Sequence, residues 1–400
     1  CEGKITMQDT LMSAFAMMHL KYPTLLEFDK ERQTPELKHN LKQLYRVQGK
    51  IPCDTYMRTI LDPVSPEQLT EPFSQLFTEV QRGGGLKPFR FKFKGVLNDR
   101  YLLAVDGTGL YSSGTCQCDE CCVKNKGKPN ESYYHQMLAG CIVHPNHSVV
   151  LPLAPEPIVQ QDGTTKNDCE KNALKRFLAN TKRKHPHLKL VILLDGLYAD
   201  APTIRLIKQY GWNFIIIAKD GNHSSLIKAV DERDSAEQVS RLEHKDDNSI
   251  QHWYRYVNGV PLNKSHPEEM VNVLNYVETD KKEKRRTWSW VTDINLTEET
   301  VAEVAIGGRC RWRIENETFN TLKNQGYEFE HNYGHGKRHL ATNLAYLTFL
   351  AFLVDQIQQL CCPIFHLALK GRAKGTRSYL WKLILRYFMS WIIDDWDELF

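Results

Sequence analysis

Two short runs of mostly apolar residues, each followed by Asp-Gly, constrain the fold of this chain more than any other feature. Residues 101–105 read Tyr-Leu-Leu-Ala-Val before Asp106-Gly107, and residues 188–194, broken only by Lys189, lead into Asp195-Gly196. A run of this length without polar alternation is typical of a strand that is covered on both faces. The sequence therefore predicts a sheet with helices on both sides.

The segments around these two runs alternate between strand and helix patterns. In chain order we predict strand 101–106, a hairpin of strands 133–143 and 149–153 joined at 144–147, helix 168–183 with Asp168 as N-cap, strand 188–194, helix 201–210 and strand 213–218. This order indicates a mixed α/β sheet with right-handed crossovers. Helical spacing also predicts helices at 10–19, 66–81, 309–325 and 340–360.

Composition places the chain among ordinary globular proteins and excludes a disordered or fibrous one. It has 400 residues, of which 42% are hydrophobic and 25% charged. The net charge of +4 does not establish a nucleic-acid partner but leaves room for a local basic face. The longest apolar stretch, residues 344–354, is shorter than the roughly 18 residues of a spanning helix, so we expect no membrane segment.

The chain contains 11 cysteines and opens with neither an initiator Met nor the pattern of a signal peptide. We therefore expect missing N-terminal residues and a reducing compartment, with free thiols or a metal site rather than disulfides. Cys118 and Cys121 form one C-x-x-C pair with His135 downstream, but a second close pair is absent. Structural zinc and free thiols both remain open for them. We expect His335, between two glycines, to shape the turn where it lies.

Two acidic residues occupy corresponding positions in the predicted sheet. Asp106 and Asp195 each end a buried strand, and on neighbouring strands their carboxylates would project from the same edge. They would then repel each other unless a cation such as Mg²⁺ lies between them. The alternative is that each Asp only stabilises a strand-to-turn boundary through local hydrogen bonds.

A third acid is available on the predicted helix 309–325. Helical spacing places Arg311, Glu315, Phe319 and either Leu322 or Lys323 along one face. The alternative is a solvated helix with salt bridges between residues four apart, which contribute only a few tenths of a kcal/mol each.

With these motifs, the chain resembles the cut-and-paste insertion-sequence transposases that have a ribonuclease-H-like Asp-Asp-Glu core, in the insertion-sequence-four-like group with a Tyr-Arg-Glu-Lys signature. The resemblance runs from about residue 9 to 353 and is strongest at 105–109, 193–199 and 311–326. It implies that Asp106, Asp195 and Glu315 are the catalytic, metal-binding triad and that Arg311 and Lys323 contact DNA.

The signature is not fully matched. Gly308 stands where the signature Tyr would be, and seven residues rather than six separate Glu315 from Lys323. Glu317 is therefore kept as the second candidate for the third acid.

The resemblance also implies the reaction and the partners. Two Mg²⁺ ions, for which Mn²⁺ can substitute, would support hydrolysis at the element ends and strand transfer into target DNA. The partners would be terminal inverted repeats and target DNA, bound by a homodimer, in the bacterial cytoplasm and at the nucleoid when DNA is bound. A metal-dependent nuclease without strand transfer and an inactive DNA-binding remnant are the alternatives.

The segment between the second and third acid is aromatic and basic. Trp288 and Trp290, or Trp253, would offer a face for a base taken out of the stack, and Lys284, Arg285 and Arg286 would contact phosphates. Alternatively the tryptophans anchor a small sheet and the basic run is a solvated loop.

Taken together, these patterns divide the chain into five regions. Residues 1–98 form a helical region for DNA contact or end pairing, 99–219 the first part of the catalytic core, 220–297 a β-rich insertion with strands at 252–257, 271–277 and 287–292, 298–360 the second part of the core, and 361–400 a helical tail.

Overall fold

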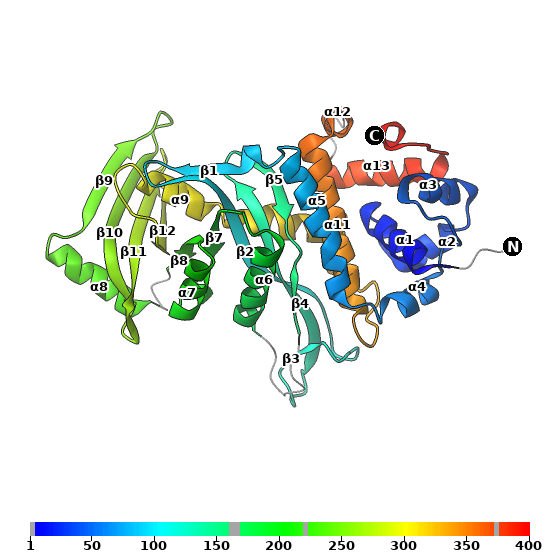
Figure 1. Ribbon diagram of the computed structural model, residues 1–400, viewed down its shortest axis with the longest axis horizontal. Coiled ribbons are helices and arrows are strands. Elements are labelled where there is room, and N and C mark those ends of the chain that lie inside the picture. Colours follow the sequence, from blue (N-terminus) through cyan, green and yellow to red (C-terminus); the bar gives the residue numbers. More distant parts are fainter. Residues whose placement is uncertain (1–4, 160–168, 219–222, 372–375) are drawn as a thin grey trace.

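The computed structural model describes residues 5–159, 169–218, 223–371 and 376–400. In Figure 1 the molecule is elongated: a β-rich part lies at one end, a helical part that holds both termini lies at the other, and the central strands lie between them. The predicted N-cap Asp168 falls outside the described residues.

Five strands form the centre of the sheet. They are β2 (Leu97–Ser113), β4 (Ser132–His144), β5 (His147–Pro152), β7 (Leu190–Leu194) and β8 (Asn213–Ile217). Strands β2, β7 and β8 are parallel, β4 is antiparallel to β2, and β5 is antiparallel to β4. The order β5-β4-β2-β7-β8, with helices against the sheet, is that of a ribonuclease-H-like core, which confirms the predicted fold class and the hairpin between β4 and β5.

Short strands extend this centre. β1 (Arg90–Phe93) pairs with β2, whereas β3 (Cys122–Lys124) and β6 (Glu156–Ile158) pair with β4. β1 lies within the region expected to be helical, so the sheet begins earlier in the chain than its first acidic strand suggests.

Helices cover both faces of the central strands, as the apolar runs predict. Two neighbouring residues of β4 show this, because successive side chains of a strand point to opposite faces. A Cβ on Gly140 would collide with Phe177 of α6 (Glu170–Lys184), whereas the Cys141 thiol contacts Thr318 of the helix that carries the third acid. α7 (Ala201–Gln209) follows β7 and packs beside α6 and against β8.

The inserted segment continues the central sheet instead of forming a separate one. It consists of α8 (Ser224–Ser235), β9 (Ser240–Lys245), β10 (Gln251–Asn263), β11 (His266–Thr279) and β12 (Arg285–Thr292). The last strand, β12, pairs antiparallel with β8 of the core. The three predicted strands are confirmed, whereas the polar pattern of α8 gave no prediction of a helix.

The N- and C-terminal helices share one hydrophobic core that is distinct from the core around the sheet. The helices of this second core, in chain order, are α1 (Met7–His19), α2 (Leu25–Glu31), α3 (Pro35–Tyr45), α4 (Asp54–Leu61), α12 (Pro363–Gly371), α13 (Arg377–Ser390) and α14 (Trp396–Leu399). The 3₁₀ turn Pro66–Thr70, α5 (Glu71–Arg82) and the 3₁₀ turn Lys87–Phe89 pack their buried side chains into the core around the sheet. The predicted helices at 10–19 and 66–81 are confirmed.

Helix α11 (Leu340–Cys361) joins the two cores, since it packs against β5 on one side and α1 on the other. It has 22 residues and is apolar enough to cross a membrane by length and composition, but most of it is buried inside the protein. Its Asp355 is buried with Lys21 at 2.5 Å and His19 at 3.1 Å. α11 is therefore a core helix that ties the terminal helices to the sheet.

Candidate catalytic site

The sheet register places Asp106 and Asp195 side by side. The last paired residues of the parallel strands β2 and β7 are Ala104 and Leu193, and each acid follows two residues later in the chain. Neighbouring strands lie about 4.8 Å apart, so the two acids belong to the same edge. One expectation was wrong: Asp106 does not end its strand, because β2 continues to Ser113 along β4, and what ends at this point is its pairing with β7.

Asp106 is partly buried and accepts two hydrogen bonds. The Gly107 amide donates to Oδ1 at 2.9 Å, and Arg311 Nη1 donates to Oδ2 at 2.9 Å. Burial raises the pKa of Asp106 to about 6, the charge of Arg311 opposes this rise, and the negative charges of Glu315 and Asp195 add to it. The negative charges of Glu315 and Asp195 therefore both reach the carboxyl of Asp106.

Asp195 directly follows β7 and begins a short turn. Its Oδ1 accepts the Leu197 amide at 2.8 Å, at the start of the 3₁₀ turn Gly196–Tyr198. One oxygen of Asp195 therefore fixes the local backbone. A purely structural Asp at a strand end would make the same hydrogen bond. Asp195 differs from such a residue because its carboxylate also lies near the carboxyl of Asp106.

The helix that carries Glu315 differs from the predicted continuous helix 309–325. α9 (Val301–Arg309) ends in a turn, a π-helical segment (Ile314–Phe319) follows, and α10 (Asn320–Asn324) completes it. A π-helical turn is wider than an α-helical turn and is frequent at functional sites. Consequently only part of the predicted face is kept: Arg311 and Glu315 stay together, whereas Phe319 and Leu322 are buried in the core.

Arg311 lies between two of the three acids. Its Nη2 donates to Glu315 Oε1 at 2.6 Å while its Nη1 bonds Asp106, and its side chain is only 14% exposed. Its Nε is buried, and no hydrogen-bond partner reaches it among the residues that the structure describes. The guanidinium thus holds together two carboxylates from β2 and the π-helical segment.

Glu317 belongs to a different environment. Its carboxylate lies 3.7 Å from Arg313, which in turn donates to the carbonyl of Pro145 in the β4–β5 turn at 2.6 Å. The other signature cation, Lys323, pairs with Glu330 at 2.8 Å. The link to Asp106 through Arg311 therefore favours Glu315 over Glu317 as the third acid.

Close packing explains why a glycine replaces the signature Tyr. A Cβ on Gly308 of α9 would lie 2.6 Å from the ring of Trp290 and 3.1 Å from Ile215 of β8. A side chain at this position would push α9 away from the sheet, and Arg311 follows one turn later.

Glu170 lies in the first turn of α6. It accepts a hydrogen bond from Gln136 Nε2 at 2.6 Å and one from the Tyr198 hydroxyl at 3.3 Å. A Cβ on Gly107 would lie 2.5 Å from its Oε1. Burial raises the pKa of Tyr198, and the charges of Glu170, Asp106 and Asp195 raise it further. Glu170 is thus a fourth acid at this edge, and the motif Asp168-Cys-Glu170 gave no signal of it.

In the insertion, the structure contradicts the predicted stacking of a DNA base on Trp290. Trp290 is 1% exposed and packs against α9, so its ring has no free face for a base. Trp288 is partly exposed, but Arg309 covers its ring at 4.7 Å and Tyr276 stacks on it at 5.4 Å. These rings form a stacked row on one face of the insertion strands, which is the structural alternative that the sequence left open.

The basic run lies at and beside the β11–β12 turn. Lys284 and Arg285 are exposed, whereas Arg286 pairs with Glu278 at 2.7 Å. Arg286 therefore contributes to the sheet, and the first two residues keep their charge toward solvent.

The acids offer only oxygen ligands, which suits hard divalent cations such as Mg²⁺. The raised pKa of Asp106 supports this fit, because a bound cation would favour the charged form that burial and neighbouring acids disfavour. The arrangement is a sheet of ribonuclease-H-like topology with carboxylates at one edge, where a divalent cation could bind.

Comparison with known proteins gives the family. Residues 97–353 match the family model described as transposase DDE domain, and the chain belongs to this family. Members of the family generally use divalent metal ions. No curated protein matches the chain. A solved structure titled a piggyBac transposase synaptic complex with hairpin DNA shares 11% identity over 96% of this chain and 71% of that chain, with a TM-score of 0.42.

Proposed function

We propose that this protein is a DNA transposase of the insertion-sequence-four-like group that moves its element by cut-and-paste transposition. The observation that supports this most is the shared electrostatic environment of Asp106, Asp195 and Glu315, which come from β2, from the end of β7 and from the π-helical segment. In the proposal, these three carboxylates hold two divalent ions, Mg²⁺ by preference and Mn²⁺ as a substitute.

The ions would supply activation of a water or a 3′-hydroxyl and stabilisation of the leaving oxygen in displacement at a phosphodiester. Asp106 and Asp195 would hold the ions at the sheet edge, and Glu315 would reach them from the π-helical segment. In the metal-free protein the pKa of Asp106 is raised to about 6, so below about that pH a cation must displace a proton from this carboxyl in order to bind.

In the proposal, the guanidinium of Arg311 binds a phosphate of the DNA. It now bridges Asp106 and Glu315, and its Nε is buried with no partner among the described residues. A guanidinium binds phosphate oxygens through two parallel N–H donors, so a DNA phosphate would satisfy the remaining donor. Lys323, one element further along the chain, would add a point charge in exchange for its pair with Glu330.

DNA contact outside the catalytic edge is proposed for Lys284 and Arg285, which are exposed. Trp288 would stack on a base only after Arg309 moves from its ring. A homodimer in the DNA complex is part of the proposal because two element ends must be joined in one assembly. The cytoplasm, with the nucleoid when DNA is bound, is the proposed location.

The test uses the full chain and a duplex that carries the element's own terminal inverted repeats, read from the DNA that flanks the reading frame. With Mg²⁺ we expect nicking at the element end, and then joining of the freed 3′ end to target DNA. Glu315→Gln should reduce nicking at least 100-fold, because it removes a metal-binding charge. Glu317→Gln, two residues away on the same helix, is the matched control and should keep activity within a few fold.

Each outcome separates one alternative. Nicking without joined product would identify a metal-dependent nuclease. DNA binding without any nicking by the wild type would identify an inactive remnant. If Glu317→Gln lost nicking and Glu315→Gln kept it, the third metal-binding acid would be Glu317 and not Glu315.

A further inference from the structure

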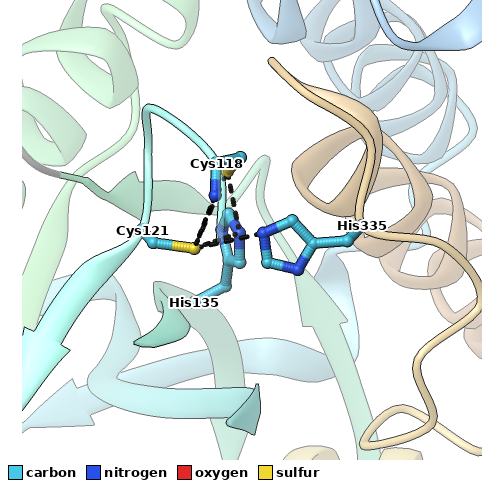
Figure 2. Close-up of side chains that lie close together, drawn as sticks. All are labelled: Cys118, Cys121, His135 and His335. Atoms are coloured by element: carbon cyan, nitrogen blue, oxygen red, sulfur yellow. Dashed lines mark hydrogen bonds between the residues drawn. The ribbon is translucent and has the colours of Figure 1, made fainter. Parts of the chain in front are cut away.

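Four side chains from three distant segments meet beside the catalytic half of the sheet. Cys118 and Cys121 lie in the loop between β2 and β3, His135 lies on β4, and His335 lies in the loop between α10 and α11. Figure 2 shows all four side chains pointing toward one common space. Among the residues that the structure describes, this is the one group of three or more His, Cys, Asp and Glu side chains that is placed to hold a metal ion.

The distances within this group are those of a tetrahedral metal site. With Zn–S bonds of about 2.3 Å and Zn–N bonds of about 2.0–2.1 Å, a tetrahedron has edges of about 3.8 Å between two sulfurs and about 3.5 Å between sulfur and nitrogen. The Sγ atoms of Cys118 and Cys121 are 3.7 Å apart, and each lies 3.4 Å from His135 Nε2. His335 Nε2 lies 3.2 Å from the Cys121 sulfur. All four ligand atoms lie within 4.8 Å of one another.

The surroundings of the group support the orientation of the ligands. The Tyr111 hydroxyl of β2 is hydrogen-bonded to His335 Nδ1, so Nε2 is the nitrogen that faces the sulfurs. A hydrogen bond to the other ring nitrogen is the usual way in which a metal-binding histidine is held in place. Cys121 and His135 are buried, and Cys118 and His335 are partly buried. A ligand set of this kind, closed by four protein atoms, is typical of a structural site.

We propose that Cys118, Cys121, His135 and His335 bind one structural Zn²⁺ ion. Two sulfurs and two imidazole nitrogens in tetrahedral arrangement suit zinc. A Rieske-type [2Fe–2S] cluster also takes two Cys and two His, but it binds the sulfurs to one iron and the imidazoles to the other, whereas here both sulfurs lie 3.4 Å from His135 Nε2. A disulfide between Cys118 and Cys121 does not account for the site, because their sulfurs are 3.7 Å apart and two imidazoles converge on them.

The site has a specific structural consequence. It fastens the far end of β2, the strand that carries Asp106, to the loop that follows the helix of Glu315 and Lys323. A second contact runs parallel to it: Glu120, between the two cysteines, accepts His339 Nδ1 at 2.6 Å and Thr342 Oγ1 at 3.1 Å. Zinc would therefore hold the elements of two catalytic acids together without touching the substrate.

The experiment measures zinc in the full chain, purified without chelator after expression in zinc-supplemented medium. Elemental analysis by mass spectrometry should find about one zinc per chain. Cys118→Ser and His335→Ala should lower this at least fivefold. Cys116→Ser is the matched control, because Cys116 lies exposed in the same loop outside the group, and it should keep one zinc.

Two further measurements keep the test independent of folding and of catalysis. Wild-type protein stripped of zinc and loaded with Co²⁺ should show the visible absorption of a tetrahedral site with thiolate ligands. Asp106→Asn should keep one zinc, since the proposed Mg²⁺ ligands are separate residues. Wild type without zinc and without this Co²⁺ spectrum would overturn the proposal, as would equal zinc loss in Cys116→Ser and Cys118→Ser. Failure of the zinc site leaves the proposed transposase activity untouched, because the latter is measured by strand cleavage.

Discussion

Replacing Asp106 by Asn should make the protein more stable while it abolishes strand cleavage. Burial, opposed by Arg311 and assisted by Glu315 and Asp195, raises the pKa of Asp106 from 3.8 to about 6. A tenfold change in an acid dissociation constant corresponds to about 1.4 kcal/mol, so the ionised carboxylate destabilises the metal-free fold by about 3 kcal/mol. Asparagine keeps an Oδ1 acceptor for the Gly107 amide and removes the charge, but it places an amide N–H₂ group where Arg311 Nη1 now donates to Oδ2, so about 3 kcal/mol is the upper bound of the gain.

The stability gain of Asp106→Asn should depend on pH, with a sign that follows from the raised pKa. The folded pKa is raised, so above about pH 6 the carboxyl is ionised in both the folded and unfolded states and its full cost is present. Below 3.8 it is protonated in both states and the cost disappears. The advantage of Asp106→Asn should therefore be at most about 3 kcal/mol at pH 8, about half of that at pH 5, and near zero below pH 3.8.

Thermal unfolding in the presence of EDTA measures the effect. For a chain of 400 residues, an unfolding entropy of about 2.1 cal/mol/K per residue converts about 3 kcal/mol into a rise in Tm of at most about 3 to 4 °C at pH 8. Mg²⁺ should raise the Tm of the wild type and have a smaller effect on Asp106→Asn, because the variant lacks one metal ligand.

Asp200→Asn is the matched control. Burial of Asp200 opposes ionisation, but the Lys171 pair and the Thr203 amide at the start of α7 outweigh it, and its pKa is lowered. This variant should therefore be less stable than the wild type at pH 8. A lower Tm for Asp106→Asn at pH 8, or an advantage that grows as the pH falls, would refute the placement of Asp106 among repelling acids.

Three further predictions follow from the same structure. Trp290→Ala should lower the unfolding free energy by about 3 to 5 kcal/mol, measured by denaturant unfolding, because Trp290 is fully packed, whereas Trp288→Ala should cost less. Gly308→Tyr, which restores the signature residue, should reduce soluble yield and Tm, since even a Cβ lies 2.6 Å from Trp290; unchanged Tm would contradict the packing argument. DNA affinity, measured by fluorescence anisotropy, should fall steeply between 50 and 200 mM salt, and Lys284→Gln with Arg285→Gln should flatten the slope by about 1 to 2 counterions.

Much of the fold follows from local patterns in the sequence. The buried runs before Asp106 and Asp195 are strands β2 and β7, because a strand covered on both faces requires apolar side chains on both. The polar helix α8 had no such pattern, since it rests on the sheet through only a few buried side chains. Its prediction would have required knowledge of the strands beneath it.

The proximity of the first two acids is also readable, because it depends only on strands that are parallel and in register. The environment of the third acid could not be predicted from the sequence in this way. The π-helical turn at Ile314–Phe319 changes which side chains share a face, so regular spacing kept Arg311 with Glu315 but misplaced Phe319. Glu170 reaches the same edge only because α6 packs across β4.

The complete set of four ligands could not be predicted from the spacing of residues in the sequence. Cys118 and Cys121 carry the usual separation of a metal-binding pair, but the partners are one histidine on the adjacent strand and another in a loop more than 200 positions downstream. His335 arrives there because the glycines beside it adopt positive φ, +156° at Gly334 and +69° at Gly336, and because Asp62 accepts the amides that follow. A site assembled by the return of a distant loop leaves no periodic trace in the sequence. Such a site can be recognised only from the folded structure. Zinc content is therefore the most direct measurement of whether the loop that carries His335 reaches the two cysteines and His135.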